Sequence, residues 1–167
     1  MPPRGTVKIE LEVLGEVQVR RRLLRFAERA GSARAAFVEI SDYLNEVEKE
    51  AFRTEGASQG TPWAPLAEST KKYKERNNLR PEILRATDKL FKALTQKANT
   101  NKKRIITPST LIQGVKGFDP AYPEILMKKP SADGGRPRKP VDLTAANKIA
   151  CVKILQRWIV TGSTRLA

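Results

Sequence analysis

The chain of 167 residues contains no histidine and only one cysteine. The absence of histidine removes the commonest general base, the Ser-His-Asp arrangement, and most zinc and non-haem iron sites. Cys151 cannot form an intrachain disulfide, and its apolar surroundings are typical of a small buried thiol. These shortages argue against several classes of enzyme and give no sign of an oxidising compartment.

Long hydrophobic runs are also missing. The N-terminus, Met1–Gly5, lacks the apolar core of a signal peptide, and no stretch approaches the roughly 20 apolar residues that span a bilayer. The Gly114–Gly117 and Gly134-Gly135 segments do not fit a P-loop or a dinucleotide fingerprint. Acidic pairs such as Asp42 and Glu46 are typical of a solvated helix face. We therefore expect a cytoplasmic product that is not an enzyme and has no catalytic residue, cofactor or metal.

Charge of one sign is abundant. Lys and Arg number 32 against 18 Asp and Glu, which gives a net charge of +14 and a pI near 10.2. Such a chain binds polyanions or acidic protein surfaces. Aromatic residues make up only 6%, so there is little to form a stacking platform for single strands. The basic residues form four clusters, namely Arg20–Arg25, Lys71–Arg76, Lys102–Arg104 and Lys128–Lys139.

The residue pattern predicts one α+β domain over 1–167, with a long N-terminal helix pair and a C-terminal helix packed on a small antiparallel sheet. Gly31-Ser32 is expected to divide the helix pair, the serine acting as N-cap. A long loop or arm over 128–140, rich in Pro, Gly and basic residues, is expected to order only against a neighbour. The predicted strands are Val7–Leu14 and, within Ile105–Val115, either a short strand pair or an edge strand, because Pro108 cannot donate to a ladder. Asn99–Arg104 is predicted to be a polar, basic turn. The predicted helices are Glu16–Arg29, Ala33–Phe52, Pro65–Arg76, a helix opened by Pro81 and reaching Leu94, and Thr144–Ile159 with Ala145, Ile149, Val152, Leu155 and Ile159 inward.

The loop after the second helix holds Trp63, one of two tryptophans. Because Pro62 and Pro65 flank it, the segment cannot continue a helix. The pattern indicates a turn that folds back and buries the indole, with its N–H on an acceptor. A buried core tryptophan is favoured over one that contacts a partner.

This segment resembles the phage virion morphogenesis family, whose members are also called tail completion proteins. The family pattern is carried by Phe52, Glu55, Gly56, Gly60, Pro62, Trp63, Leu66 and Thr70, then by Ile83, Leu84, Thr87, Leu90 and Leu94. Weaker similarity extends over Ile105–Gly114 and Arg136–Thr144. Asp88 stands where the family usually has glycine, and Pro120–Pro123 lacks the family's histidine and glutamine.

The resemblance implies a structural virion protein of the neck or connector, assembled in the host cytoplasm and needed for head–tail joining or tail completion. Its partners would be copies of itself in a ring, a hexamer or dodecamer, and neighbouring neck, portal-side or tail proteins, with non-specific contact to packaged DNA and no membrane. The acidic helix Ala33–Arg53 beside basic segments suits head-to-tail packing of copies. The alternative is a basic nucleic-acid-binding module. Candidate interface residues are Arg20, Arg21, Arg22, Lys128, Lys129, Arg136, Arg138 and Lys139.

Overall fold

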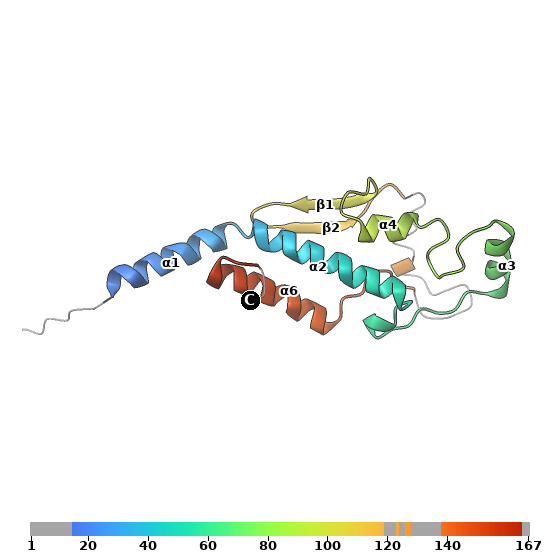
Figure 1. Ribbon diagram of the computed structural model, residues 1–167, viewed down its shortest axis with the longest axis horizontal. Coiled ribbons are helices and arrows are strands. Elements are labelled where there is room, and N and C mark those ends of the chain that lie inside the picture. Colours follow the sequence, from blue (N-terminus) through green and yellow to red (C-terminus); the bar gives the residue numbers. More distant parts are fainter. Residues whose placement is uncertain (1–14, 119–122, 124–125, 128–137, 165–167) are drawn as a thin grey trace, which may run out of the picture.

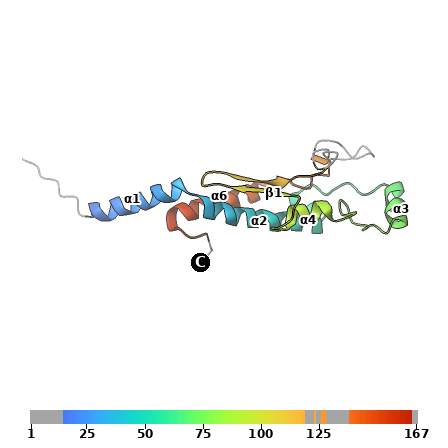
Figure 2. The ribbon, with the colours of Figure 1, turned by 90° about the horizontal axis from the view of Figure 1, so that it is seen from above.

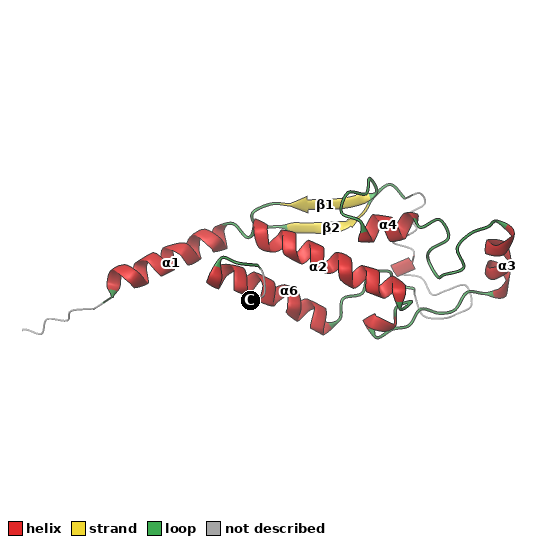
Figure 3. Ribbon diagram, viewed as in Figure 1, coloured by secondary structure: helices red, strands yellow, loops and turns green. Residues whose placement is uncertain are grey.

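The computed structural model describes residues 15–118, 123, 126–127 and 138–164, and it is elongated (Figure 1). The predicted strand Val7–Leu14 and most of the predicted arm, including Lys128, Lys129 and Arg136, lie outside these residues. The α+β class is confirmed, with helices predominating and one antiparallel hairpin (Figure 3). The elements are α1 (Glu16–Gly31), α2 (Arg34–Arg53), the 3-10 turn η1 (Ala57–Gln59), α3 (Glu68–Arg76), α4 (Lys89–Thr95), β1 (Lys102–Ile106), β2 (Leu111–Val115) and α6 (Ala145–Thr161).

Helix α2 is the centre of the molecule, with the β1–β2 hairpin along one side and α6 along another (Figures 1 and 2). Its prediction is confirmed to within a residue at each end, because apolar residues recur at helical spacing over five turns. The Tyr43 hydroxyl donates to Asn147 of α6 at 2.9 Å, and the Ser41 hydroxyl donates to Gln113 of β2.

Helix α1 differs from its prediction. It projects beyond the body, and none of its residues is buried, so it does not join a layer on the sheet (Figure 1). Ser32 caps the C-terminus of α1 rather than the N-terminus of α2, whose N-cap is Ala33. The Ala33 N–H donates to the carbonyl of Pro108 in the hairpin turn at 2.8 Å, and no side chain caps the N-terminus of α2.

The C-terminal helix is present, but its orientation was predicted wrongly. The Thr144 hydroxyl caps it by accepting from the Asn147 N–H at 3.2 Å. Ile149 and Val152, expected inward, are 55% and 52% exposed, and Ala145 is exposed too. Leu155 and Ile159 are half-buried. Apolar residues lie all around this helix, so periodicity alone could not identify the face that meets α2.

The segment after Pro81 is not a helix until Lys89, so the predicted start was wrong by two turns. Leu84 and Asp88 have φ of 60° and 55°, in the left-handed region, which a right-handed helix cannot contain. Asp88 is the N-cap of α4. Helix α3 likewise begins at Glu68 rather than Pro65, and it ends before Asn77-Asn78 as expected.

The hairpin begins earlier than predicted, because Lys102–Arg104 is strand and not turn. Its register pairs Lys102 with Val115, Arg104 with Gln113 and Ile105 with Ile112. Lys102 and Arg104 therefore face α2, and the two isoleucines face outward.

The contact between the hairpin and α2 is a buried polar network. The Lys102 ammonium donates to the Asn45 side chain and to the Leu94 carbonyl, the latter at 2.6 Å, while the Gln113 amide donates to Asn45 at 3.1 Å. Burial raises the pKa of Glu48 to about 7, although the charge of Lys102 and a hydrogen bond with Gln113 act against that rise. The inward Lys102 is stable here because Asn45 of α2 and the Leu94 carbonyl accept its hydrogen bonds, whereas Arg104 has only an ion pair with Asp42 at 3.6 Å.

The apolar core lies at the other end of α2 and consists of Phe52, Trp63, Ile83, Leu90 and Leu94. All five of these residues belong to the family pattern, so the pattern describes the core of the fold.

Candidate protein-protein interface

The chain reverses at the end of α2 through two residues with positive φ. Glu55 and Gly56 have φ of 48° and 87°, and the Gly56 N–H donates to the Ala51 carbonyl at 2.8 Å, which closes the helix. The backbone N–H of Trp63 then donates to the Glu55 carbonyl at 2.7 Å. These two backbone hydrogen bonds close the loop, so the chain folds back and places the Trp63 indole beneath the C-terminal end of α2.

Gly56 cannot be replaced without moving this indole. A Cβ at Gly56 would lie 2.6 Å from Cδ1 of Trp63 and 2.7 Å from the Thr61 carbonyl oxygen, well inside van der Waals contact. Its positive φ disfavours a side chain as well. Glycine at position 56 therefore allows the backbone to pack closely against the Trp63 ring.

Trp63 is 5% exposed, and its ring meets Phe52 edge to face at a centroid distance of 5.3 Å. Phe52 contacts Phe91 in the same manner, also at 5.3 Å. The indole N–H donates to the carbonyl of Lys139 at 2.9 Å. The prediction of a buried tryptophan with a satisfied N–H is confirmed, and its acceptor lies 76 residues away in the sequence.

Lys139 and Arg138 were predicted to belong to an arm that orders only against a neighbour. Instead, Arg138 donates to the carbonyls of Ala64 and Pro65 at 2.8 and 2.6 Å. These two residues hold the tryptophan loop of their own chain, so the arm prediction is wrong at this end of the segment. The Pro, Gly and basic residues that surround Arg138 and Lys139 in the sequence give no signal of this long-range contact.

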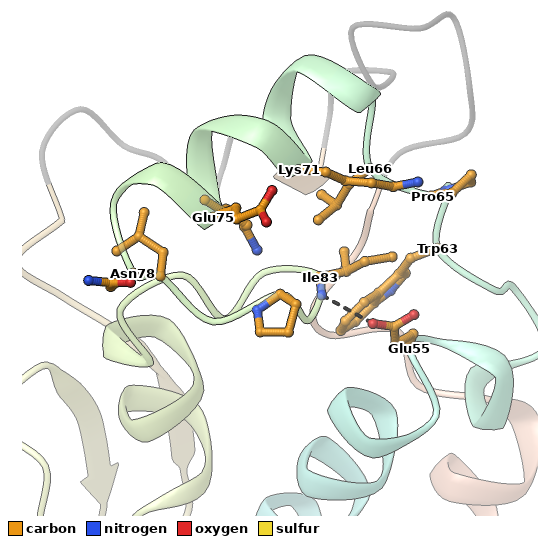
Figure 4. A pocket seen from close by; sticks show the side chains of 11 residues that line it. Glu55, Trp63, Pro65, Leu66, Lys71, Glu75, Asn78 and Ile83 are labelled. Carbon is orange, nitrogen blue, oxygen red and sulfur yellow. Dashed lines mark hydrogen bonds between the residues drawn. The ribbon is translucent and has the colours of Figure 1, made fainter.

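Glu55 links the loop to the segment before α4. Its carboxylate accepts the Ile83 N–H at 3.1 Å, which supplies a partner for a peptide group outside regular structure (Figure 4). This gives the glutamate of the Glu-Gly pair a structural role.

The backbone conformation of Asp88 explains why glycine is usual in the family pattern at this position. Its φ of 55° is one that glycine adopts without strain and that Asp tolerates better than most residues. Arg85 and Arg80 bind its carboxylate at 2.8 and 2.9 Å. The hydrogen bond from Arg85 holds the pKa of Asp88 below its usual range. Two ion pairs thus stabilise a conformation that the backbone alone disfavours.

The predicted motif residues fall into three groups by burial. Phe52, Gly56, Trp63 and Leu90 are buried, Glu55, Leu66, Thr70 and Leu84 are half-buried, and Gly60 and Pro62 are exposed.

A pocket of about 710 Å³ opens beside Trp63, below α3 (Figure 4). Its apolar lining includes Trp63, Leu66 and Ile83, and its charged lining includes Lys71 and Glu75. An apolar floor with charges at the rim suits a protein segment better than a polar metabolite. This pocket is one candidate contact surface.

The second candidate surface is α1, at the opposite end of the molecule (Figure 2). Val19 and Leu23 are 56% and 59% exposed, and Arg20, Arg21 and Arg22 stand exposed around this apolar stripe. The structure therefore separates the predicted interface residues: α1 carries three at one end, and Arg138 and Lys139 lie at the tryptophan loop.

Two of the predicted basic clusters each contain a buried lysine whose structural role the sequence did not reveal. Lys74 of α3 is 6% exposed and donates to the Glu82 carbonyl at 2.7 Å, and burial lowers its pKa. Lys102 is also 6% exposed. These cations bind protein acceptors and are not available to a polyanion.

Among the described residues, no group of three or more His, Cys, Asp or Glu side chains is placed to hold a metal ion. No helix in that part of the chain is both long and apolar enough to cross a bilayer. Cys151 is half-buried, and burial raises the pKa of its thiol.

The fold and these surfaces define a helical scaffold with a tightly built core and unlike surfaces at its two ends. The chain belongs to the phage virion morphogenesis family, whose model matches residues 15–109. The matched range contains the whole of Phe52–Leu94 and adds α1 and α2 to it, whereas the weaker similarity predicted beyond residue 109 lies outside the match. The chain matches no curated protein and no solved structure. Membership connects it with the structure or assembly of phage particles.

Proposed function

We propose that this protein is a structural subunit of the neck or connector of a tailed phage, required for head–tail joining or tail completion, and that it acts by binding rather than catalysis. The observation that carries the proposal is the family match over residues 15–109. The subunit would reside in the virion, after assembly in the host cytoplasm.

The shape of the molecule supports a ring. The apolar stripe of α1 and the pocket beside Trp63 lie at opposite ends and differ in composition, so contact between copies would be heterologous. Heterologous contacts close into rings when the rotation between subunits divides a full turn. We propose a hexamer or dodecamer that also contacts neighbouring neck, portal-side or tail proteins.

The alternative, a basic nucleic-acid-binding module, is favoured by the net charge of +14. Lys74 and Lys102 reduce that case, because each is buried and donates to protein oxygen atoms. Duplex DNA binding by the purified protein at physiological salt would favour the alternative. Contact with packaged DNA in a ring would be non-specific and would weaken with salt.

Electron microscopy of a phage that lacks this protein tests the proposal. We expect filled capsids and complete tails that do not stably join, with normal replication and lysis. A phage complemented with the parent chain is the control. Joined virions without the protein, or capsids that do not package DNA, would contradict the neck assignment.

A further inference from the structure

The β1–β2 hairpin has an outward apolar pair and, among the described residues, no third strand. In the described part of the chain the sheet has two strands, so the outer edge of each has peptide groups without a strand partner. Ile105 and Ile112 are paired across the strands and are 44% and 43% exposed. Such an edge is a template for another strand, and small sheets gain stability from a third one.

Arg104 of β1 marks the face that an added strand would meet. Its Nε and Nη2 atoms are buried and have no hydrogen-bond acceptor among the described residues, and its closest acidic oxygen, on Asp42, lies 3.6 Å from Nη2. Buried N–H groups that have no hydrogen-bond acceptor are costly, even though the Arg104 side chain as a whole is 25% exposed. A carboxylate beside β1 would complete its coordination.

Helix α1 leads away from this hairpin and is held in that direction (Figure 1). Arg29 donates to the carbonyls of Ile159 and Val160 at 3.2 and 2.7 Å. Trp158 donates in return to the carbonyl of Ser32 at 3.1 Å. The C-terminal ends of α1 and α6 are thus bound together, while the rest of α1 stands free of the body.

Residues 7–14 are too short to lie along β1 of their own chain while α1 keeps its direction. The hairpin turn lies at the base of α1, where Pro108 accepts from Ala33, and β1 ends beside that turn at Ile106. The 16 residues of α1 put Gly15 about 24 Å from that base. Eight extended residues span at most roughly 26 Å, so a segment of that length folded back along α1 would reach only the hairpin turn and leave no residues to pair with β1. The residues before them include Pro2 and Pro3, which have no N–H for a ladder.

We propose that residues 7–14 of one copy add as a third strand to the free edge of β1 in a neighbouring copy, with α1 as the spacer between the two bodies. The proposal rests on the proposed function in that it needs copies side by side. The alternation of these residues puts Val7, Ile9, Leu11 and Val13 on one face, beside Ile105 and Ile112. Glu10 and Glu12 then lie on the face of Arg104 and supply the carboxylate.

Disulfide trapping between two single-cysteine proteins tests the exchange. In a Cys151→Ser background, Leu11→Cys chains are mixed with Ile105→Cys chains, so a bond between the two sites forms only between copies. After mild oxidation, we expect a mixed dimer, identified by mass spectrometry, at least several-fold above that from a control mixture with Val38→Cys. Val38 is 39% exposed on α2 and is a matched surface position.

Two results would overturn the proposal. One is an equal yield of mixed dimer with the control. The other is a bond within single chains when Leu11→Cys and Ile105→Cys are combined in one protein. Thermal melting of each variant beforehand establishes that it folds.

The outcome separates this inference from the neck assignment. If the mixed dimer forms but phage without the protein still joins heads to tails, the exchange stands and the neck role fails. If heads and tails stay apart but no specific dimer forms, the neck role stands and the exchange fails.

Discussion

Replacing Trp63 with alanine should destabilise the fold by about 3–5 kcal/mol, the range for removing a large aromatic side chain from a core. The indole is 5% exposed and packs edge to face on Phe52, so its removal leaves a cavity under the end of α2. It also leaves the Lys139 carbonyl without its N–H donor, a loss of about 1 kcal/mol that belongs within that range.

Thermal melting measures the effect. For a chain of 167 residues, each kcal/mol corresponds to roughly 2–4 °C, so the melting temperature should fall by roughly 6–20 °C. Trp63→Phe keeps most of the ring and loses the N–H donor, and it should cost about 1–2 kcal/mol. Trp158→Ala is the matched control, because this second tryptophan is half-buried and lies outside the core cluster.

The reasoning is refuted if Trp63→Ala melts with the parent protein. If that variant also failed to assemble, Trp63 would be an anchor for a partner, reached through the adjoining pocket, and not the centre of the core.

Two further changes test the loop and the polar network. Gly56→Ala should destabilise the protein by about 1–3 kcal/mol or more, because the φ of 87° is strained for alanine and the new Cβ would clash with Trp63. Gly60→Ala is the control: its φ is 77° but the space around it is open, so it should cost less in the same urea titration. For Glu48, the pKa of about 7 in the folded state lies above the ordinary 4.5, so the native state binds the proton more tightly; the resulting stability is full below pH 4.5 and is lost as pH rises through 7. Urea midpoints from pH 5 to 8 should therefore fall more steeply for the parent than for Glu48→Gln, and parallel curves would show that this carboxyl does not titrate in the window.

Several features were predictable because they depend on residues close together in the sequence. The spacing of Phe37, Ile40, Leu44 and Val47 predicts α2, since a helix repeats every 3.6 residues and needs only local information. The prolines around Trp63 predict a turn that buries the ring, because proline excludes continuation of the helix. The family pattern identified the residues of the core by the same local signal.

Other features were decided by contacts between distant parts of the chain. Lys102 faces inward because Asn45 of α2 accepts its hydrogen bond, and Arg104, two residues on, lies on the same face near Asp42; the alternation of the strand alone does not predict this. Helix α4 begins late because Asp88, bound by two arginines, holds a left-handed conformation at its N-cap.

The sequence by itself determined the existence of the amphipathic helices, the strong positive charge and the buried tryptophan. Tertiary structure decided which apolar faces found partners: the stripe of α1, with Val19 and Leu23, has the same periodicity as α2, yet α2 is enclosed by the hairpin and α6 while α1 extends past both. The physical reason is that helical spacing specifies a face but not what covers it. Whether an apolar face is covered depends on which other segments the chain can bring to it. For α1 it also depends on the contacts of Arg29 and Trp158, which direct this helix away from the body.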